Sequence, residues 1–250
     1  MTAHSHPCCL RLSVVIPAYN EEKLIAGTIG GLRKSLRGAG FGEGAFEIIV
    51  CDNASSDATA ALAVEAGARV VFEPERQIAR ARNVGASWAR APWLLFLDAD
   101  SWPDVALMGE LLGALADYRV VAGGCTMRMD DVPRTIGVAL RAWNLTSRLC
   151  RWGAGAFIFC RRDAFQAIGG FGLDFYVAEE IDFSRRIKRW GAARRLRFRV
   201  LHRHPLLTSS RKGALYSQRE IGALMLSMLR HPRRFFHDRR LLTLWYDGRR

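Results

Sequence analysis

The sequence predicts an α/β protein with a mostly parallel central sheet. Short apolar segments alternate with segments of helical spacing along the N-terminal half, a pattern typical of βαβ units. The apolar segments are short, continuous and rich in β-branched residues, which favours buried strands. Three of them lead into acidic residues, at Glu21, Asp52 and Asp98. Because parallel strands present their carboxyl ends at one edge of a sheet, we expect these acids to converge on one cleft.

The individual elements are predicted from the same patterns. Apolar runs predict strands over residues 12–16, 46–51, 69–72, 93–97, 120–129, 156–160 and 195–201. Helical spacing and capping residues predict helices over residues 21–36, 58–66, 77–89, 104–117, 132–149, 179–191 and 214–229. We expect Pro17 to stop the first strand. We also expect Glu21 and Glu22 to open the first helix, where the helix dipole favours acidic side chains.

The strand over residues 93–97 is central to the prediction, because it runs directly into Asp98-Ala99-Asp100. Alternate side chains of a strand point the same way, so both carboxylates would leave the sheet together. Two close carboxylates repel each other unless a cation lies beside them. Hard divalent cations take such oxygen ligands and share them with phosphates. A second interpretation stays open, in which Asp98 caps a turn and Asp100 starts the next helix.

Charge is distributed unevenly along the 250 residues. Residues 1–184 contain 18 basic and 21 acidic side chains, whereas residues 185–250 contain 19 and 3. This asymmetry indicates an anionic partner, such as a membrane surface, a nucleic acid or a phosphorylated substrate. The sequence contains no evident transmembrane segment or signal peptide, and its cysteines suggest no disulfide framework. We therefore expect a cytoplasmic protein.

Five short motifs, each weak alone, together carry a family resemblance. They are SVVIPAYNEE at 13–22, DNASSD at 52–57, ARNVG at 81–85, DAD at 98–100 and EEID at 179–182. In this order and spacing they resemble the inverting glycosyltransferases of family 2. The resemblance implies the nucleotide-diphospho-sugar transferase fold, which is GT-A and Rossmann-like. We expect a flexible tail over residues 1–10, a glycosyltransferase domain over 11–205 and a basic helical extension over 206–250.

The resemblance implies transfer of a sugar from a nucleotide-diphosphate sugar, with a UDP-sugar as the expected donor, to an acceptor hydroxyl with inversion. It also implies Mn²⁺ or Mg²⁺, which offsets the charge on the leaving diphosphate. The expected donor-binding residues are Pro17, Ala18, Tyr19, Glu21, Asp52, Arg82, Asp98, Ala99 and Arg211. Asp100 is the expected metal ligand of the DxD motif, with His204 as a further one. Two alternatives stay open: Glu21 could only stabilise a helix terminus, and Arg82 could lie on a solvated face.

An inverting transfer needs a general base for the acceptor hydroxyl. The family supplies it from an acidic pair that is followed, two residues on, by Asp. Here the matching residues are Glu179, Glu180 and Asp182, and Glu180 is the expected base. The family more often has Asp at that place, so the longer glutamate side chain changes the reach of the carboxylate. The alternative is that these acids only stabilise a helix N-terminus.

Two other functions compete with the glycosyltransferase. A nucleotidyltransferase of similar fold would carry a glycine-rich, basic loop after the first strand, whereas the loop here is acidic. A non-enzymatic protein could bind anionic partners through residues 185–250, but no recognised nucleic-acid motif accompanies the charge, so no nucleic acid is expected. Many relatives use lipid-linked acceptors. We therefore expect an acceptor of that kind and peripheral contact of the C-terminal extension with an anionic membrane surface, on the inner face of the cell membrane.

Overall fold

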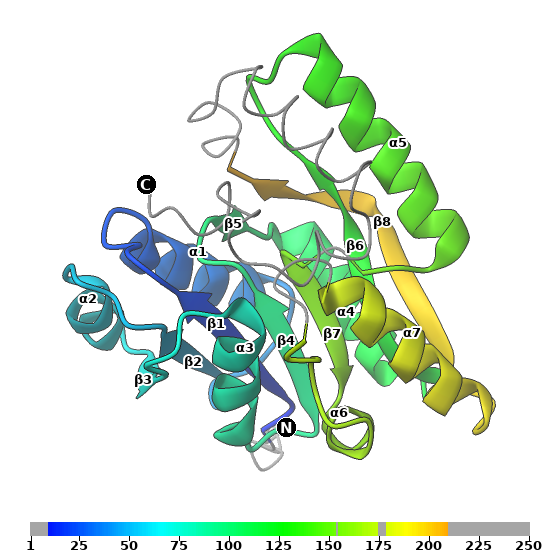
Figure 1. Cartoon of the computed structure of the whole chain (residues 1–250), viewed down its shortest axis with the longest axis horizontal. Helices are drawn as coiled ribbons and strands as arrows, with labels where there is room; N and C mark the ends of the chain where they lie inside the picture. Colours follow the sequence, from blue (N-terminus) through cyan, green and yellow to red (C-terminus); the bar gives the residue numbers. More distant parts are fainter. Residues whose placement is uncertain (1–9, 154, 175–178, 210–250) are drawn as a thin grey trace, which may run out of the picture.

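The computed structural model describes residues 10–153, 155–174 and 179–209. Their strands form a single eight-stranded sheet in the order β3-β2-β1-β4-β7-β6-β8-β5. Helices cover both faces of this sheet (Figure 1). The sheet is mixed but mostly parallel, which confirms the predicted fold class. The helix expected over residues 214–229 and most of the terminal segments lie outside the described residues.

The N-terminal half builds the parallel part of the sheet. Its elements are β1 (Leu12–Ala18), α1 (Ile25–Gly38), β2 (Phe46–Asp52), α2 (Thr59–Glu65), β3 (Arg69–Phe72), α3 (Ile78–Ser87) and β4 (Trp93–Leu97). The strands pair in parallel, β3 with β2, β2 with β1 and β1 with β4. Their side chains are buried on both faces, against α1 and α2 on one side and α3 on the other. Double burial explains why these strands read as continuous apolar runs.

The second half adds strands of both directions. Its elements are β5 (Ser101–Trp102), α4 (Val105–Ala116), β6 (Val120–Arg128), α5 (Arg134–Cys150), β7 (Phe157–Arg161), α6 (Arg162–Ala167), α7 (Glu179–Ala192) and β8 (Arg197–Thr208). β7 runs antiparallel to both β4 and β6, while β8 is parallel to β6. Two reversals restore the direction, so β6 and β8 run the same way as β4. The carboxyl ends of β1, β2, β4, β6 and β8 therefore share one edge, which we call the carboxyl edge.

Two predicted boundaries near this edge are wrong. β1 continues through Pro17 to Ala18. Its pairing with β4 ends at Val15, so the missing N–H of Pro17 breaks no hydrogen bond to β4, and the pairing with β2 continues. The first helix begins at Ile25 rather than at Glu21. Glu21 instead starts a turn, in which its carbonyl accepts the N–H groups of Leu24 and Ile25.

Three further differences concern elements that depend on distant pairing. The sequence did not predict β5, a two-residue strand defined only by its pairing with β8, or the short helix α6. β8 is also longer than expected and reaches Thr208, where it pairs with Ser101. Among the described residues, no helix is both long and apolar enough to cross a bilayer.

Gly85 lets α3 lie close against β1. A Cβ atom at this position would come within 2.4 Å of Val15 Cγ1, a buried atom of the central strand. Real side chains do not approach so closely, so any larger residue must push the helix off the sheet. Since α3 also carries Arg82, this close packing fixes how far α3 stands from the carboxyl edge.

We predict that Gly85→Ala lowers the free energy of unfolding by about 1–3 kcal/mol, because it overpacks the contact between helix and strand. The matched control is Gly30→Ala in α1, where an added Cβ meets nothing within 4 Å. That variant should be as stable as the parent or up to about 1 kcal/mol more stable, from helix propensity alone. Urea unfolding of the three proteins measures both effects. Equal stability of the two variants would contradict the packing argument.

Candidate functional site

The loops that follow β1 and β2 interlock at the carboxyl edge. Asn20 adopts a left-handed backbone conformation with φ of 52°. Its N–H donates to Ser55 Oγ at 3.0 Å, and its Oδ1 accepts from the N–H of Ser56 at 2.9 Å. Asparagine tolerates this conformation better than most residues. The reciprocal hydrogen bonds hold the two loops as one rigid wall.

Asn53 fixes a third loop to the same wall. Its Nδ2 donates to the carbonyl oxygens of Glu73 and Glu75 at 3.0 and 2.7 Å, and its Oδ1 accepts from the N–H of Gln77 at 3.0 Å. The preceding residue, Asp52, is buried at the end of β2 and accepts the N–H of Ser55 at 3.3 Å. The amide of Asn53 thus ties the β3–α3 loop to the loop that carries Asp52.

Tyr19 and Glu21 lie in the same wall, directly after Pro17 and Ala18 of β1. The guanidinium carbon of Arg76 stands 4.2 Å from the centre of the Tyr19 ring, a cation–π contact. Glu21 is buried, and its N–H donates to Thr59 Oγ1 at 2.7 Å. Glu21 does not belong to the first turn of α1, which contains no acidic residue. Its carbonyl nevertheless accepts the N–H of Ile25, the first residue of α1, so Glu21 still contacts the start of this helix.

Arg82 forms hydrogen bonds with both acidic motifs, the one that follows β4 and the one that starts α7. Its side chain is 1% exposed, which excludes the alternative of a solvated face. Nη1 donates to Glu179 Oε1 at 2.6 Å, while Nη2 donates to Asp98 Oδ1 at 3.1 Å and to the carbonyl of Gly155 at 2.9 Å. Burial opposes the charge of a guanidinium, but the carboxylates of Asp98, Glu179 and Glu180 outweigh it and raise the pKa of Arg82. The arginine is therefore a permanent buried cation among three acids.

Two neighbours hold the Arg82 side chain in place. The ring of Phe171 lies 5.2 Å from the guanidinium carbon. Asn83, the next residue of α3, fixes Phe171 by donating from Nδ2 to its carbonyl and accepting its N–H at Oδ1, both at 2.9 Å. A Cβ atom on Gly155 would stand 3.2 Å from Arg82 Nη2 and 3.8 Å from Glu180 Cδ. Only the first of these contacts would be tighter than usual, so the glycine leaves space for Arg82.

The three acids at the start of α7 have different surroundings. Glu179 is buried and paired with Arg82. Asp182 is turned along the helix, with Oδ2 2.7 Å from Nε of Arg186. Glu180 has no such ion pair among the described residues, and burial together with the charge of Glu179 raises its pKa to about 8. A pKa of about 8 lets Glu180 bind a proton near neutral pH.

The predicted DxD motif follows β4 as expected. Asp98 is partly exposed and pairs with Arg82, whereas Asp100 is 7% exposed. Between them, Ala99 is buried and its carbonyl accepts Thr28 Oγ1 at 2.6 Å. Asp100 is fixed through its backbone, because its carbonyl accepts the N–H of Ser209 at 3.0 Å. Asp100 does not start the next helix, because α4 begins at Val105 and is capped by Asp104.

The remaining predicted site residues lie apart from this group. His204 sits on β8 with Nδ1 2.7 Å from Oε1 of Glu110, so its ring faces α4. Arg211 lies outside the described residues. Within the described ranges, no group of three or more His, Cys, Asp or Glu side chains is arranged to hold a metal ion. The structure therefore brings together Asp98 and Arg82 with Glu179 and Glu180, but not His204.

Comparison with protein families distinguishes between the glycosyltransferase and nucleotidyltransferase interpretations of the carboxyl edge. The sequence model described as "Glycosyl transferase family 2" matches residues 13–181, which include the first four motifs and the first three residues of the fifth. The chain belongs to glycosyl transferase family 2. Membership in this family gives the nucleotidyltransferase alternative no support, and it accounts for the fold on which the cluster is built.

Family 2 proteins from several organisms resemble this chain. An uncharacterized glycosyltransferase of Mycobacterium tuberculosis is 30% identical over 145 residues, or 55% of this chain and 60% of that protein. The lipopolysaccharide core biosynthesis glycosyltransferase LpsC of Rhizobium meliloti is 31% identical over 157 residues, or 59% and 53%. The structure of a Pyrobaculum calidifontis mannosyltransferase with GDP-Man and Mn²⁺ superposes with a TM-score of 0.61 at 24% identity, over 80% and 56%. The matched regions thus span little more than half of these proteins.

Sequence reasoning missed three residues that organise the site. Asn53 and Asn83 both use a side-chain amide to satisfy backbone groups of a distant loop, and Gly155 makes room beside Arg82. Both asparagines lie inside motifs that the sequence had marked, so their position was a signal. Their partners are 20 and 88 residues away, which no local pattern reveals.

We predict that Arg82→Leu lowers the free energy of unfolding by about 3–5 kcal/mol, since it leaves Asp98 and Glu179 without their buried partner. The matched control is Arg80→Leu on the same helix, where the arginine pairs with the exposed Glu75 and contributes about 0–1 kcal/mol. Urea unfolding at neutral pH measures both. Adding Glu179→Gln to Arg82→Leu should recover part of the loss, because one unpaired charge is removed. If the two substitutions lower the free energy of unfolding equally, Arg82 does not hold the buried network together.

Proposed function

We propose that this chain transfers a sugar from a nucleotide-diphosphate sugar to an acceptor hydroxyl, with inversion at the anomeric carbon. The observation that carries this proposal is the cluster at the carboxyl edge, in which Arg82 links Asp98 to Glu179 beside Glu180. Family 2 membership supports the reaction class. A UDP-sugar is the first donor to test. GDP-mannose is the second, because the structurally similar mannosyltransferase was solved with it.

The wall formed by the loops after β1 and β2 is the proposed binding site for the nucleotide. Tyr19, stacked with Arg76, would lie along the base or ribose, and Asp52 would accept hydrogen bonds from the base. The buried Glu21 and the backbone of Pro17 and Ala18 would shape the floor of this site. The cross-linked loops are pre-organised, which reduces the entropy lost when the donor binds.

The donor atoms of the DxD motif suit a hard divalent cation. Asp100 offers a carboxylate, and Mn²⁺ or Mg²⁺ commonly takes one or two protein carboxylates and completes its shell with phosphate oxygens. Bound there, the cation would offset the negative charge that develops on the diphosphate. We place His204 outside this ligand set, because its ring pairs with Glu110. Asp98 is held by Arg82 and would contact the ribose and diphosphate side of the donor.

Glu180 is the proposed general base. It would take the proton of the acceptor hydroxyl as that oxygen attacks the anomeric carbon, on the face opposite the diphosphate. Glu179 would keep Arg82 in place, and Asp182 would brace α7 through Arg186. Both are positioning residues in this scheme. The division explains why three neighbouring acids are present although one base is needed.

The acceptor is proposed to be lipid-linked, and the reaction to take place on the cytoplasmic side of a membrane. The similarity to LpsC, named for lipopolysaccharide core biosynthesis, supports such an acceptor. The four cysteines of the described residues are free thiols, as expected in a reducing compartment. The membrane contact expected of the C-terminal extension falls on residues outside the described ranges and stays a prediction.

We predict that the correct nucleotide sugar raises the melting temperature by about 5 °C or more at 100-fold excess over its Kd, with a larger rise when Mn²⁺ is present. UDP-, GDP- and dTDP-sugars are screened by thermal shift. Asp100→Ala should abolish the increment due to Mn²⁺. The control Glu43→Ala, at a site whose side chain is 78% exposed, should retain it. If no nucleotide sugar shifts the parent protein, with or without metal, the donor proposal is wrong.

We predict that Glu180→Gln leaves the donor-induced thermal shift in place and lowers kcat at least about 100-fold, because an amide cannot accept the acceptor proton. In the parent protein, kcat/KM should fall as the pH drops below about 8, since the raised pKa of Glu180 then leaves the base protonated. Asp182→Asn serves as the control and should keep the same pH profile. Normal transfer by Glu180→Gln would show that another residue is the base.

A further inference from the structure

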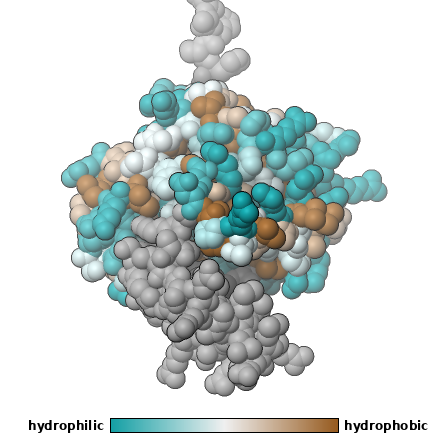
Figure 2. All heavy atoms as spheres, turned by 90° about the horizontal axis from the view of Figure 1, so that it is seen from above, coloured by the Kyte–Doolittle hydropathy of each residue, from teal (hydrophilic) through white to brown (hydrophobic). Residues whose placement is uncertain are grey.

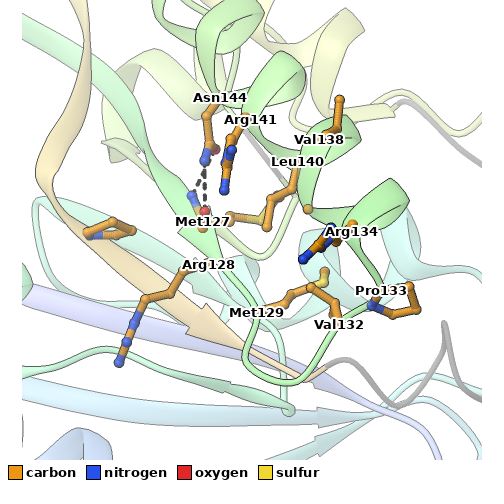
Figure 3. A pocket seen from close by; sticks show the side chains of 12 residues that line it. Met127, Arg128, Met129, Val132, Pro133, Arg134, Val138, Leu140, Arg141 and Asn144 are labelled. Carbon is orange, nitrogen blue, oxygen red and sulfur yellow. Dashed lines mark hydrogen bonds between the residues drawn. The ribbon is translucent and has the colours of Figure 1, made fainter.

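Helix α5 is joined to the sheet by few polar anchors. Asn144 donates from Nδ2 to the carbonyl of Met127 at 2.8 Å and accepts its N–H at 3.0 Å, which fixes the helix to the end of β6 (Figure 3). Ser147, its only buried residue, donates from Oγ to the carbonyl of Trp152 at 2.6 Å. Neither apolar cluster of the core includes a residue of α5. The helix stands beside the domain rather than within it (Figure 1).

The outer face of α5 carries an exposed row of apolar side chains. Val138, Leu145 and Leu149 are 62%, 56% and 74% exposed. Their spacing of seven and four residues puts them on one side of the helix, opposite the side that holds Ser147. Contiguous exposed apolar patches often mark interaction sites. The three aligned aliphatic side chains therefore indicate a contact surface.

A row of arginines runs beside the apolar row. Arg134, Arg141 and Arg148 recur every seven residues, and all three are exposed. The helix contains no Asp or Glu, and none of the three arginines forms an ion pair within the described residues. Figure 2, seen from above the view of Figure 1, shows hydrophobic and hydrophilic residues interspersed on that side of the molecule. The combination is an amphipathic face with only positive charge.

We propose that this outer face of α5 docks on the surface of an anionic lipid bilayer. Apolar side chains flanked by arginines are what an interfacial helix needs, since the first enter the acyl boundary and the second pair with lipid phosphates. A second copy of the chain fits less well, because two identical arginine rows would repel each other. A nucleic acid would use the arginines but leave the apolar row in water. The proposal concerns a surface outside the sugar-transfer site and does not depend on the proposed reaction.

The docking face lies close to the carboxyl edge. Its N-terminal part borders a hollow of about 670 Å³ at the end of β6 (Figure 3). Val138, Arg134 and Arg141 of the docking face line this hollow together with Met127, Met129 and Leu140. Across the sheet, Arg128 of β6 aligns with Leu207 of β8, and Leu207 aligns with Trp102 of β5. Adjacent strands are about 4.8 Å apart, so the hollow begins within about 10 Å of the segment that follows Asp100. A membrane at α5 would therefore lie near the segment that follows Asp100.

The test is vesicle flotation of the full chain without any nucleotide sugar. The parent protein should bind phosphatidylcholine vesicles that contain about 30% phosphatidylglycerol and should bind pure phosphatidylcholine at least about tenfold less. Replacing Val138, Leu145 and Leu149 together by Gln should lower the partition coefficient on anionic vesicles about tenfold or more. Replacing Arg134, Arg141 and Arg148 together by Gln should lower it by a similar factor.

Matched controls separate this surface from general charge and hydrophobicity. Val64, Phe72 and Tyr118 are 58%, 62% and 72% exposed away from α5, and their joint replacement by Gln should leave binding unchanged. So should the replacement of Arg189, Arg194 and Arg195, which are exposed at the end of α7 and just after it. Thermal unfolding checks that each variant is folded. Unchanged binding of either α5 variant overturns the proposal, as does an equal loss in the controls. A dimer that the apolar α5 variant dissociates while vesicle binding persists would assign the face to a second copy.

Discussion

The buried guanidinium of Arg82 is the interaction on which the site depends. It connects α3, the end of β4 and the start of α7. Phe171 also links α3 to α7, because Asn83 holds its backbone and its ring stacks on Phe183. A buried cation is costly unless its hydrogen bonds are met. Here two carboxylates and the carbonyl of Gly155 accept from the two terminal nitrogens of Arg82, while its buried Nε has no hydrogen-bond partner among the described residues. The acids are in turn held at fixed positions by a partner that stays charged at any physiological pH. Stability and geometry at the carboxyl edge therefore have the same origin.

The topology of the sheet determines what can gather at that edge. The wall of loops and the DxD motif follow the parallel strands β1, β2 and β4. The antiparallel β7 lets β6 and β8 return in the same direction. One edge thus receives loops from both halves of the chain. The proposed donor site comes from the first half and the acidic start of α7 from the second. The amphipathic α5 follows β6 directly, which is why the proposed membrane face adjoins the same edge.

The sequence was informative where chemistry is local. The apolar run of β4 ending in Asp98 and Asp100, and the alternation of strands and helices, predicted the fold class and the acidic edge. The predictions were wrong where a distant partner decides the outcome. Pro17 stays inside β1 because the β4 pairing ends before it, and β5 exists only through β8. The burial of Arg82 could not be read from its helix, since Glu179 lies 97 residues away.

Arg82 gives the two glutamates at the start of α7 different surroundings. Arg82 pairs directly with Glu179, whereas burial and the neighbouring Glu179 carboxylate raise the pKa of Glu180. A glutamate at position 180, where the family more often has aspartate, needs room for one more methylene. A Cβ atom on Gly155 would make an ordinary contact with Glu180 Cδ, at 3.8 Å, but a tight one with Arg82 Nη2, at 3.2 Å. A substitution of Gly155 would therefore disturb Arg82 first and, through it, the acids that Arg82 holds.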